Sequence, residues 1–288
     1  MSVVFLCVGA AKAGTSWLHR QLSSHPDCHF RAIKELHYFD AIDGGKLDRE
    51  FRKHRDWQQS ELEKVARSGL GDSDAQAVKL SDRGAWLNVL ERQDEDVAAY
   101  LEYLRGGADQ AKVVGEMTPA YALLTRDRLA LMATMAPDVR FLYLLRDPVE
   151  RLWSHVRMMA ARRDPKGAVS PERCAAILNR TISGEETQIV KRSDYSTALR
   201  KLTSAVAPAK LLVDVFEDVV RGEGLNRICR FLGIAQMDAS LAPVHAGQPL
   251  SMSAAQRGMA TTWLAPQYAA AEAALGRRPD AWGQGGWT

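Results

Sequence analysis

Residues 3–17 spell VVFLCVGAAKAGTSW, an apolar run followed by two glycines five positions apart and two hydroxyl residues. The apolar run Val3–Val8 is typical of a buried strand, and the residues after Gly14 are typical of a helix. A glycine-bounded loop between a strand and a helix directs main-chain N–H groups at an anion, and the helix N-terminus adds partial positive charge. We expect Thr15 and Ser16 to cap this helix. The candidate anion-binding residues are Gly9, Ala11, Lys12, Ala13, Gly14, Thr15, Ser16 and Trp17.

Short apolar runs alternate with amphipathic segments along the rest of the chain. Further buried strands are predicted at Val113–Gly115, Val139–Leu145 and Leu211–Phe216. The helix before Pro137 is expected to bury one face, formed by Leu129, Leu131, Met132 and Met135. This alternation predicts a single α/β domain over residues 1–288, P-loop-like, with a central, mostly parallel sheet flanked by helices. Its ligand is expected at the carboxyl ends of the strands.

Composition excludes several classes of protein. The 288 residues are 25% charged with a net charge of +3, which is too weak to indicate a nucleic-acid partner. The four cysteines form no C-x-x-C pair, which argues against a zinc ribbon or a disulfide framework. Neither a membrane span nor a signal peptide is evident. We therefore expect a cytoplasmic protein that binds no nucleic acid and no membrane.

The glycine loop differs from that of a nucleoside triphosphatase. Such loops place lysine directly after the second glycine, where it reaches the outer phosphates. Here that position is Thr15, and the lysine lies inside the loop as Lys12. This placement suits contact with the bridging oxygen of a departing group. The alternatives are a plain strand–turn–helix junction with a surface lysine, or a P-loop kinase or triphosphatase.

A second candidate anion element follows the strand Val139–Leu145. Arg146 comes directly after the strand, and Ser154 lies about two turns into the next helix. A guanidinium fork with a hydroxyl suits a second phosphate. Asp147, between Arg146 and a proline, is a poor match to an acid that holds Mg²⁺. The alternative is a surface ion pair of Arg146 with Asp147 or Glu150.

Taken together, these segments resemble the PAPS-dependent sulfotransferases, where PAPS is 3′-phosphoadenosine 5′-phosphosulfate. Gly9–Trp17 is similar to the 5′-phosphosulfate loop of that family and Arg146–Ser154 to its 3′-phosphate element. The branch that includes heparan sulfate sulfotransferase domains and soluble bacterial sulfotransferases shares further motifs. These are Lys34–Phe39, Gly115–Tyr121, Asp194-Tyr195, Phe231–Ile234 and Leu275–Trp282.

This resemblance implies a bacterial sulfotransferase that uses PAPS, releases 3′-phosphoadenosine 5′-phosphate (PAP) and needs no metal. Glu35 would be the base that takes the acceptor's proton, and Lys12 would stabilise the leaving group. His37 could act directly or be structural, and Tyr195 joins the cofactor-binding set. On spacing alone, Glu35 could instead be a surface residue paired with Lys34.

The acceptor is the main open question. A hydroxyl of a carbohydrate, lipid or small molecule is the first choice and an amine the second. The family often has lysine where this chain has Met117, and its basic loop is replaced here by His245–Pro249. Residues 41–96 and 162–192 are predicted to wall the acceptor side, or else to be solvated surface. The oligomeric state is left open, and a non-catalytic binding protein of the same fold remains an alternative.

Overall fold

In the part of the chain that the structure describes, five parallel strands form one central sheet. The structure, a computed structural model, describes residues 2–68, 74–239 and 248–283. The strand order across the sheet is β2-β3-β1-β4-β5, and every neighbouring pair is parallel. The strands are β1 (Val3–Gly9), β2 (Cys28–Phe30), β3 (Val113–Met117), β4 (Val139–Leu145) and β5 (Leu211–Val215).

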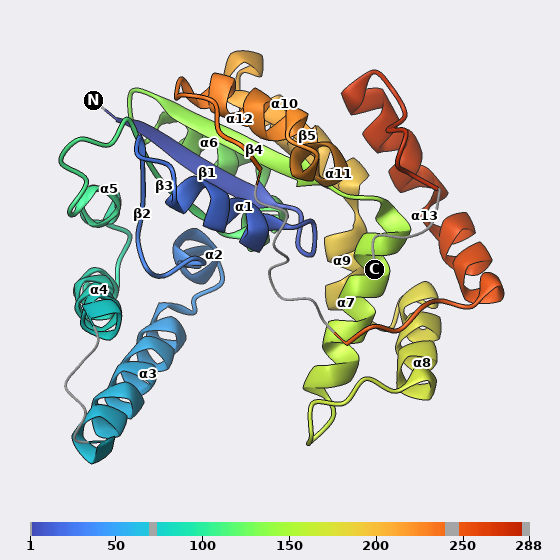
Figure 1. The fold of residues 1–288 in the computed structure, drawn as a ribbon, viewed down its shortest axis with the longest axis horizontal. Coiled ribbons are helices and arrows are strands. Elements are labelled where there is room, and N and C mark those ends of the chain that lie inside the picture. The colour runs from blue at the N-terminus through green and yellow to red at the C-terminus, as the bar shows by residue number, and fades with distance from the viewer. Residues whose placement is uncertain (1, 69–73, 240–247, 284–288) are drawn as a thin grey trace.

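Helices cover both faces of this sheet. The connection through α1 (Thr15–Ser23) runs from β1 towards β2, whereas the one through α6 (Arg126–Thr134) crosses in the opposite direction from β3 to β4. Because such crossovers are right-handed, the two helices lie on opposite faces, as Figure 1 shows. The remaining helices are α2 (Tyr38–Asp43), α3 (Leu47–Ser68), α4 (Asp74–Leu90), α5 (Val97–Arg105), η1 (Pro119–Leu123), α7 (Pro148–Arg162), α8 (Pro171–Ile182), α9 (Thr187–Ser193), α10 (Tyr195–Ala205), η2 (Pro208–Lys210), α11 (Phe216–Val220), α12 (Glu223–Leu232) and α13 (Ala254–Leu275).

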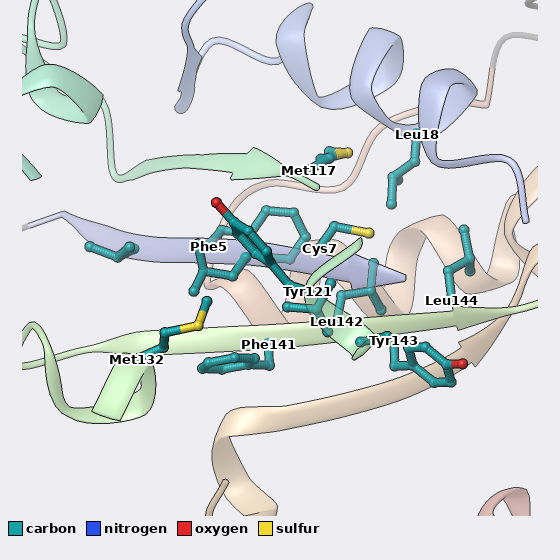
Figure 2. Packing of buried hydrophobic residues seen from close by; sticks show 14 of the residues in the cluster. Phe5, Cys7, Leu18, Met117, Tyr121, Met132, Phe141, Leu142, Tyr143 and Leu144 are labelled. Carbon is teal, nitrogen blue, oxygen red and sulfur yellow. The ribbon is translucent and has the colours of Figure 1, made fainter. Parts of the chain in front are cut away.

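The core lies on both sides of β1 and β4, whose side chains are almost all buried. Figure 2 shows Leu18 of α1 and Met132 of α6 approaching these strands from opposite sides. Phe5 pairs in register with Gly115, where an added Cβ would lie 1.9 Å from the Phe5 carbonyl oxygen. Glycine at 115 therefore permits the close approach of β1 and β3.

The sequence predicted most of this architecture. The parallel sheet and its flanking helices are confirmed, and β4 has the predicted bounds. β2 was not predicted, because three half-buried residues are too few to show a strand pattern. Phe216 begins α11 rather than ending β5. The prediction that Leu131 belongs to the buried face of its helix was wrong. Leu131 is 62% exposed, whereas Leu129 and Met132 are buried.

The two segments assigned to the acceptor side are helical. Residues 41–96 contain the end of α2, all of α3 and α4, and α3 packs against α4. Residues 162–192 contain α8 and most of α9, and both helices contact α7. In Figure 1 the α3–α4 pair and the α7–α8 group extend below the sheet on separate sides. Their role towards an acceptor, and the single domain over residues 1–288, remain predictions.

Among the described residues, no helix combines the length and the apolar composition that crossing a bilayer requires.

We predict that Leu142→Ala lowers the free energy of unfolding by about 2–5 kcal/mol, because the substitution leaves a cavity in the centre of β4. Leu142 is wholly buried, whereas Leu131 is 62% exposed. Leu131→Ala is the matched control, with an expected change within about 0.5 kcal/mol. Urea denaturation of both variants measures the difference. Equal losses would contradict the assigned core.

Candidate active site

The loop after β1 has the shape that the sequence predicted, but its helix starts differently. Gly14 is the N-cap of α1 and has a φ of +80°. A Cβ at this position would lie 2.0 Å from the Phe216 ring, so both the backbone conformation and the space require glycine. Thr15 and Ser16 are the first helical residues, and no side chain caps the helix. The expectation that these hydroxyls cap α1 was therefore wrong.

Several main-chain N–H groups of the loop have no internal acceptor. Ala10 donates to the Leu144 carbonyl (2.8 Å), and Ala13 donates to the Ala10 carbonyl (3.1 Å). The N–H of Ala13 is thus engaged within the loop. Among the described residues, the N–H groups that donate to no protein atom in this loop and the first helical turn include those of Ala11, Lys12, Gly14, Thr15 and Ser16. Such a set of donors at a helix N-terminus suits an anion.

Two arginines bind the carbonyl groups of the same loop. Arg146, directly after β4, donates through Nη1 to the Lys12 carbonyl (3.4 Å). Arg151, in the first turns of α7, donates through Nη1 to the Ala11 carbonyl (3.4 Å). These contacts engage successive carbonyl oxygens of the loop. The partial negative charge of these oxygens therefore faces arginine donors and not an incoming anion. The structure thereby brings the two sequence-predicted anion elements together.

The cations of this region have few counter-ions. Within the described part of the chain, no carboxylate lies within ion-pair distance of Lys12, Arg146 or the fully buried Arg151. Burial, and then repulsion by Arg146, Arg162 and Arg157, lower the pKa of Lys12. A partly buried positive site without carboxylates at ion-pair distance favours a ligand that brings negative charge.

The alternative ion pairs of Arg146 are not formed. Glu150 pairs with Arg257 (2.7 Å), and Asp147 caps α7 by accepting from the N–H groups of Val149 (2.9 Å) and Glu150 (3.0 Å). The guanidinium of Arg146 lies over the Phe216 ring instead, 5.6 Å from its centroid. No group of three or more His, Cys, Asp or Glu in the described residues is arranged to hold a metal ion.

Ser154 and Tyr195 occupy different surroundings. Ser154 is half-buried on α7, and its hydroxyl has no hydrogen-bond partner among the described residues. Tyr195 is wholly buried. Its hydroxyl donates to the Arg146 carbonyl (2.9 Å) and accepts from the Arg146 N–H (3.3 Å). Tyr195 therefore holds the main chain of Arg146.

The segment that contains Glu35 is anchored by a buried carboxylate on β3. The Leu36 N–H donates to Glu116 Oε2 (3.1 Å) and to Thr118 Oγ1 (3.0 Å). The Lys34 carbonyl accepts from the Met117 N–H (3.3 Å). These bonds fix the main chain on both sides of Glu35, so that residues 34–37 lie beside the carboxyl end of β3. The Gly115–Tyr121 motif thus positions the Lys34–Phe39 motif.

Glu35 lies between two cationic groups. Lys34 Nζ lies 2.7 Å from Glu35 Oε1, and His37 Nε2 lies 3.5 Å from Glu35 Oε2. The other ring nitrogen of His37 lies 3.0 Å from Asp40 Oδ2. The Lys34 pair that spacing suggested is therefore present, yet it belongs to a larger cluster. The Glu35 side chain remains 42% exposed, so an acceptor can reach it.

These contacts hold both groups in their charged forms. Burial opposes ionisation of Glu35, but the His37 hydrogen bond and the Lys34 charge outweigh it and lower its pKa to about 2. Burial also opposes protonation of His37, but its bonds to Asp40 and Glu35 raise its pKa to about 10. At neutral pH, Glu35 is therefore a carboxylate beside an imidazolium.

The loop and the Glu35 segment meet at Lys34 and Lys12. Lys34 Nζ also donates to Thr15 Oγ1 (3.3 Å). The charge of Glu35 is close enough to Lys12 to oppose the lowering of its pKa. The catalytic pair predicted from sequence, Lys12 and Glu35, thus shares one electrostatic environment at the carboxyl ends of β1 and β3.

Two positions that depart from the family pattern differ in how far the structure describes them. Met117 is wholly buried, and Figure 2 places it among the core residues at the end of β3. Its side chain therefore contacts the core and is not exposed to an acceptor. His245–Gly247 lies outside the described residues. The carbonyl of the following Gln248 accepts from Arg157 (3.1 Å).

Sequence reasoning missed several residues of this site: Asp40, Arg151, Arg192 and Phe216. Asp40 supports His37, and Phe216 contacts both Arg146 and the Gly14 position. Arg192 lies on α9. Burial lowers its pKa, and the charges of Asp40 and Glu35 oppose that change. Asp40 and Arg151 lie three and five residues beyond the motif residues His37 and Arg146, a spacing that offered a local signal. Phe216 and Arg192 are brought near only by the fold.

Comparison with known proteins agrees with this geometry. The model of the sulfotransferase family matches residues 5–238, most of the chain. The chain belongs to the sulfotransferase family, and it is accordingly an enzyme of the sulfotransferase class. No curated protein sequence matches it significantly.

Solved structures share the fold. A sulfotransferase from Alicyclobacillus acidocaldarius is 23% identical, with a TM-score of 0.65 and coverage of 98% of this chain and 99% of that one. The sulfotransferase domain of the Synechococcus PCC 7002 olefin synthase is 19% identical, with a TM-score of 0.51 and coverage of 91% and 87%. The sulfotransferase domain from the curacin biosynthetic pathway is 17% identical, with a TM-score of 0.54 and coverage of 96% and 98%.

We predict that the His37 ring titrates with a pKa of about 10, which NMR of the labelled imidazole measures. Asp40→Asn removes one of its two carboxylate partners and should lower this pKa towards the ordinary value. Because the folded-state pKa is raised, the stability from His37 is complete below about pH 6.5 and is lost as pH rises through about 10. A His37→Asn spectrum assigns the signal. Titration of the native ring near pH 6.5 would contradict the cluster.

Proposed function

We propose that this enzyme transfers the sulfuryl group of PAPS to a hydroxyl group, with an amine as the second choice, and releases PAP. One observation carries the proposal. An anion loop with cations that lack carboxylate partners lies beside an ionised, partly exposed Glu35. A charged donor and a neutral nucleophile need these two environments next to each other.

The residues present fit PAPS as the donor. The free N–H groups of Ala11, Gly14 and Thr15, with the Lys12 ammonium, suit the 5′-phosphosulfate. Arg146 and the unpartnered Ser154 hydroxyl suit the 3′-phosphate. When bound, PAPS supplies an activated sulfuryl group. These cations and N–H groups would neutralise its phosphates without a metal.

Glu35 would act as the base towards the acceptor hydroxyl. Its pKa of about 2 keeps it ionised across the working range, ready to accept a hydrogen bond. A weak base suffices if the proton moves late, since the hydroxyl becomes more acidic as its oxygen bonds to sulfur. Lys34 and His37 hold the carboxylate in place. Lys12, with its lowered pKa, would stabilise the charge that forms on the leaving phosphate.

The structure offers less support to the rival functions. A kinase would need an acid free to bind Mg²⁺, yet both carboxylate oxygens of Asp147 accept hydrogen bonds from the protein. A non-catalytic binding protein would not need the Asp40–His37–Glu35 cluster.

We propose that helices α3, α4, α8 and α9 shape the acceptor side, which suits a carbohydrate, lipid or small-molecule hydroxyl.

The first test is calorimetric binding of PAP and ADP without metal. We expect micromolar or tighter binding of PAP and at least about tenfold weaker binding of ADP. Arg146→Ala should remove most of this preference, because it deletes the cation assigned to the 3′-phosphate. Arg200→Ala, an exposed residue of α10, is the control. Equal binding of the two nucleotides, or a requirement for Mg²⁺, would refute the proposal in favour of a kinase or triphosphatase.

The second test follows transfer of radiolabelled sulfate from PAPS to a panel of sugars, alkyl alcohols, sterols and phenols. With an acceptor from this panel, Glu35→Gln should lower kcat at least about a hundredfold. Lys12→Ala should lower it at least about tenfold, equivalent to about 1.4 kcal/mol. Glu102→Gln, an exposed glutamate of α5, is the control. Near-full turnover by Glu35→Gln would show that another group is the base.

A further inference from the structure

Residues 279–283 form a turn that closes onto the segment after β4. The Trp282 N–H donates to the Pro279 carbonyl (3.0 Å). The Trp282 side chain is buried, with 4% exposure, and its ring packs edge-on against Tyr268 of α13 at a centroid distance of 5.8 Å. The sequence left open whether the tail from Trp282 to Trp287 is ordered. Trp282 belongs to the hydrophobic core, and residues 284–288 lie outside the described residues.

This turn makes two hydrogen bonds to buried carboxylates. Trp282 Nε1–H donates to Glu217 Oε2 (3.2 Å). The Gly283 N–H donates to Asp147 Oδ2 (3.1 Å). The two residues are also linked, because Glu217 Oε1 accepts from the main-chain N–H of Asp147 (3.0 Å). Glu217 and Asp147 are 2% and 4% exposed, so water cannot replace a lost donor without rearrangement.

Both carboxylates adjoin Arg146. Asp147 follows it in the chain and fixes the first turn of α7 through the Val149 and Glu150 N–H groups. Glu217 follows Phe216, whose ring lies beneath the Arg146 guanidinium. Asp147 Oδ1 also accepts from the Tyr268 hydroxyl (3.0 Å). The 279–283 turn thus binds the carboxylates of the two residues that follow Arg146 and Phe216 in the chain.

We propose that Trp282 is a positioning residue for recognition of the nucleotide 3′-phosphate, acting through Glu217 and Asp147 on Arg146. This inference rests on the proposed function. Without the indole N–H, Glu217 loses a donor in a buried site and shifts to regain one. Because Glu217 holds the Asp147 N–H, the Arg146 fork then loses its fixed direction. The loop N–H groups assigned to the 5′-phosphate make no hydrogen bond to Glu217 or Asp147 among the described residues, and Arg146 reaches the loop at the Lys12 carbonyl, so we expect a smaller effect on 5′-phosphate binding.

The test compares PAP with adenosine 5′-monophosphate, which lacks only the 3′-phosphate. Trp282→Phe keeps an aromatic ring and removes the N–H donor. We expect it to weaken PAP binding at least about fivefold in calorimetry and to leave monophosphate binding within about twofold. Trp263→Phe is the matched control and should change neither affinity, because Trp263 of α13 is half-buried against a hydrophobic cluster that includes Leu152 of α7 and Leu178 of α8.

The possible results separate this inference from the proposed function. Equal weakening of both nucleotides would mark Trp282 as merely structural, and unchanged PAP binding would also overturn the inference. If the native enzyme binds both nucleotides equally, the proposed function fails and this inference fails with it. If Trp282→Phe does not fold, Tyr268→Phe is the second variant. It removes the hydroxyl that donates to Asp147 and must show the same selective loss for PAP.

Discussion

The candidate site depends on one buried carboxylate, Glu116 of β3. It accepts hydrogen bonds from the hydroxyl groups of Tyr100 (2.6 Å), Tyr121 (2.8 Å) and Thr118 (2.5 Å) and from the Leu36 N–H (3.1 Å). Burial raises its pKa, and these four donors oppose that rise. A buried acceptor left without donors costs about 1–3 kcal/mol for each missing partner, so the surrounding chain must stay in place. The Glu35 segment is therefore held beside the end of the glycine loop.

Around this anchor, the site divides into two electrostatic halves. Lys34, His37, Glu35 and Asp40 form a cluster of two cations and two anions whose charges compensate one another. Lys12 and Arg146 instead have no carboxylate within ion-pair distance among the described residues. In the half that contains Glu35, the charges are already balanced, so a neutral acceptor can bind there without a large change in the charge of the site. The uncompensated half gains most from an anion, which is the condition for binding a charged donor.

Local patterns predicted the parts of the molecule whose role depends on neighbours in sequence. The central strands were recognised because strands buried on both faces are continuously apolar. The short β2 lacked that signal, and Leu131 was misplaced because helical spacing does not show how wide the buried face is. Tyr195 was assigned to the cofactor by resemblance. The structure shows that its hydroxyl binds the main chain of Arg146.

The sequence by itself determined the parallel α/β fold and the glycine loop, and it suggested the two anion elements with Glu35, since these follow from apolar periodicity and local spacing. Only the tertiary structure decided that Met117 belongs to the core and that residues 279–283 contact the segment after β4. The physical reason is that strand order brings together residues more than a hundred positions apart. The charge of a group such as His37 then depends on burial and on partners that no local pattern records.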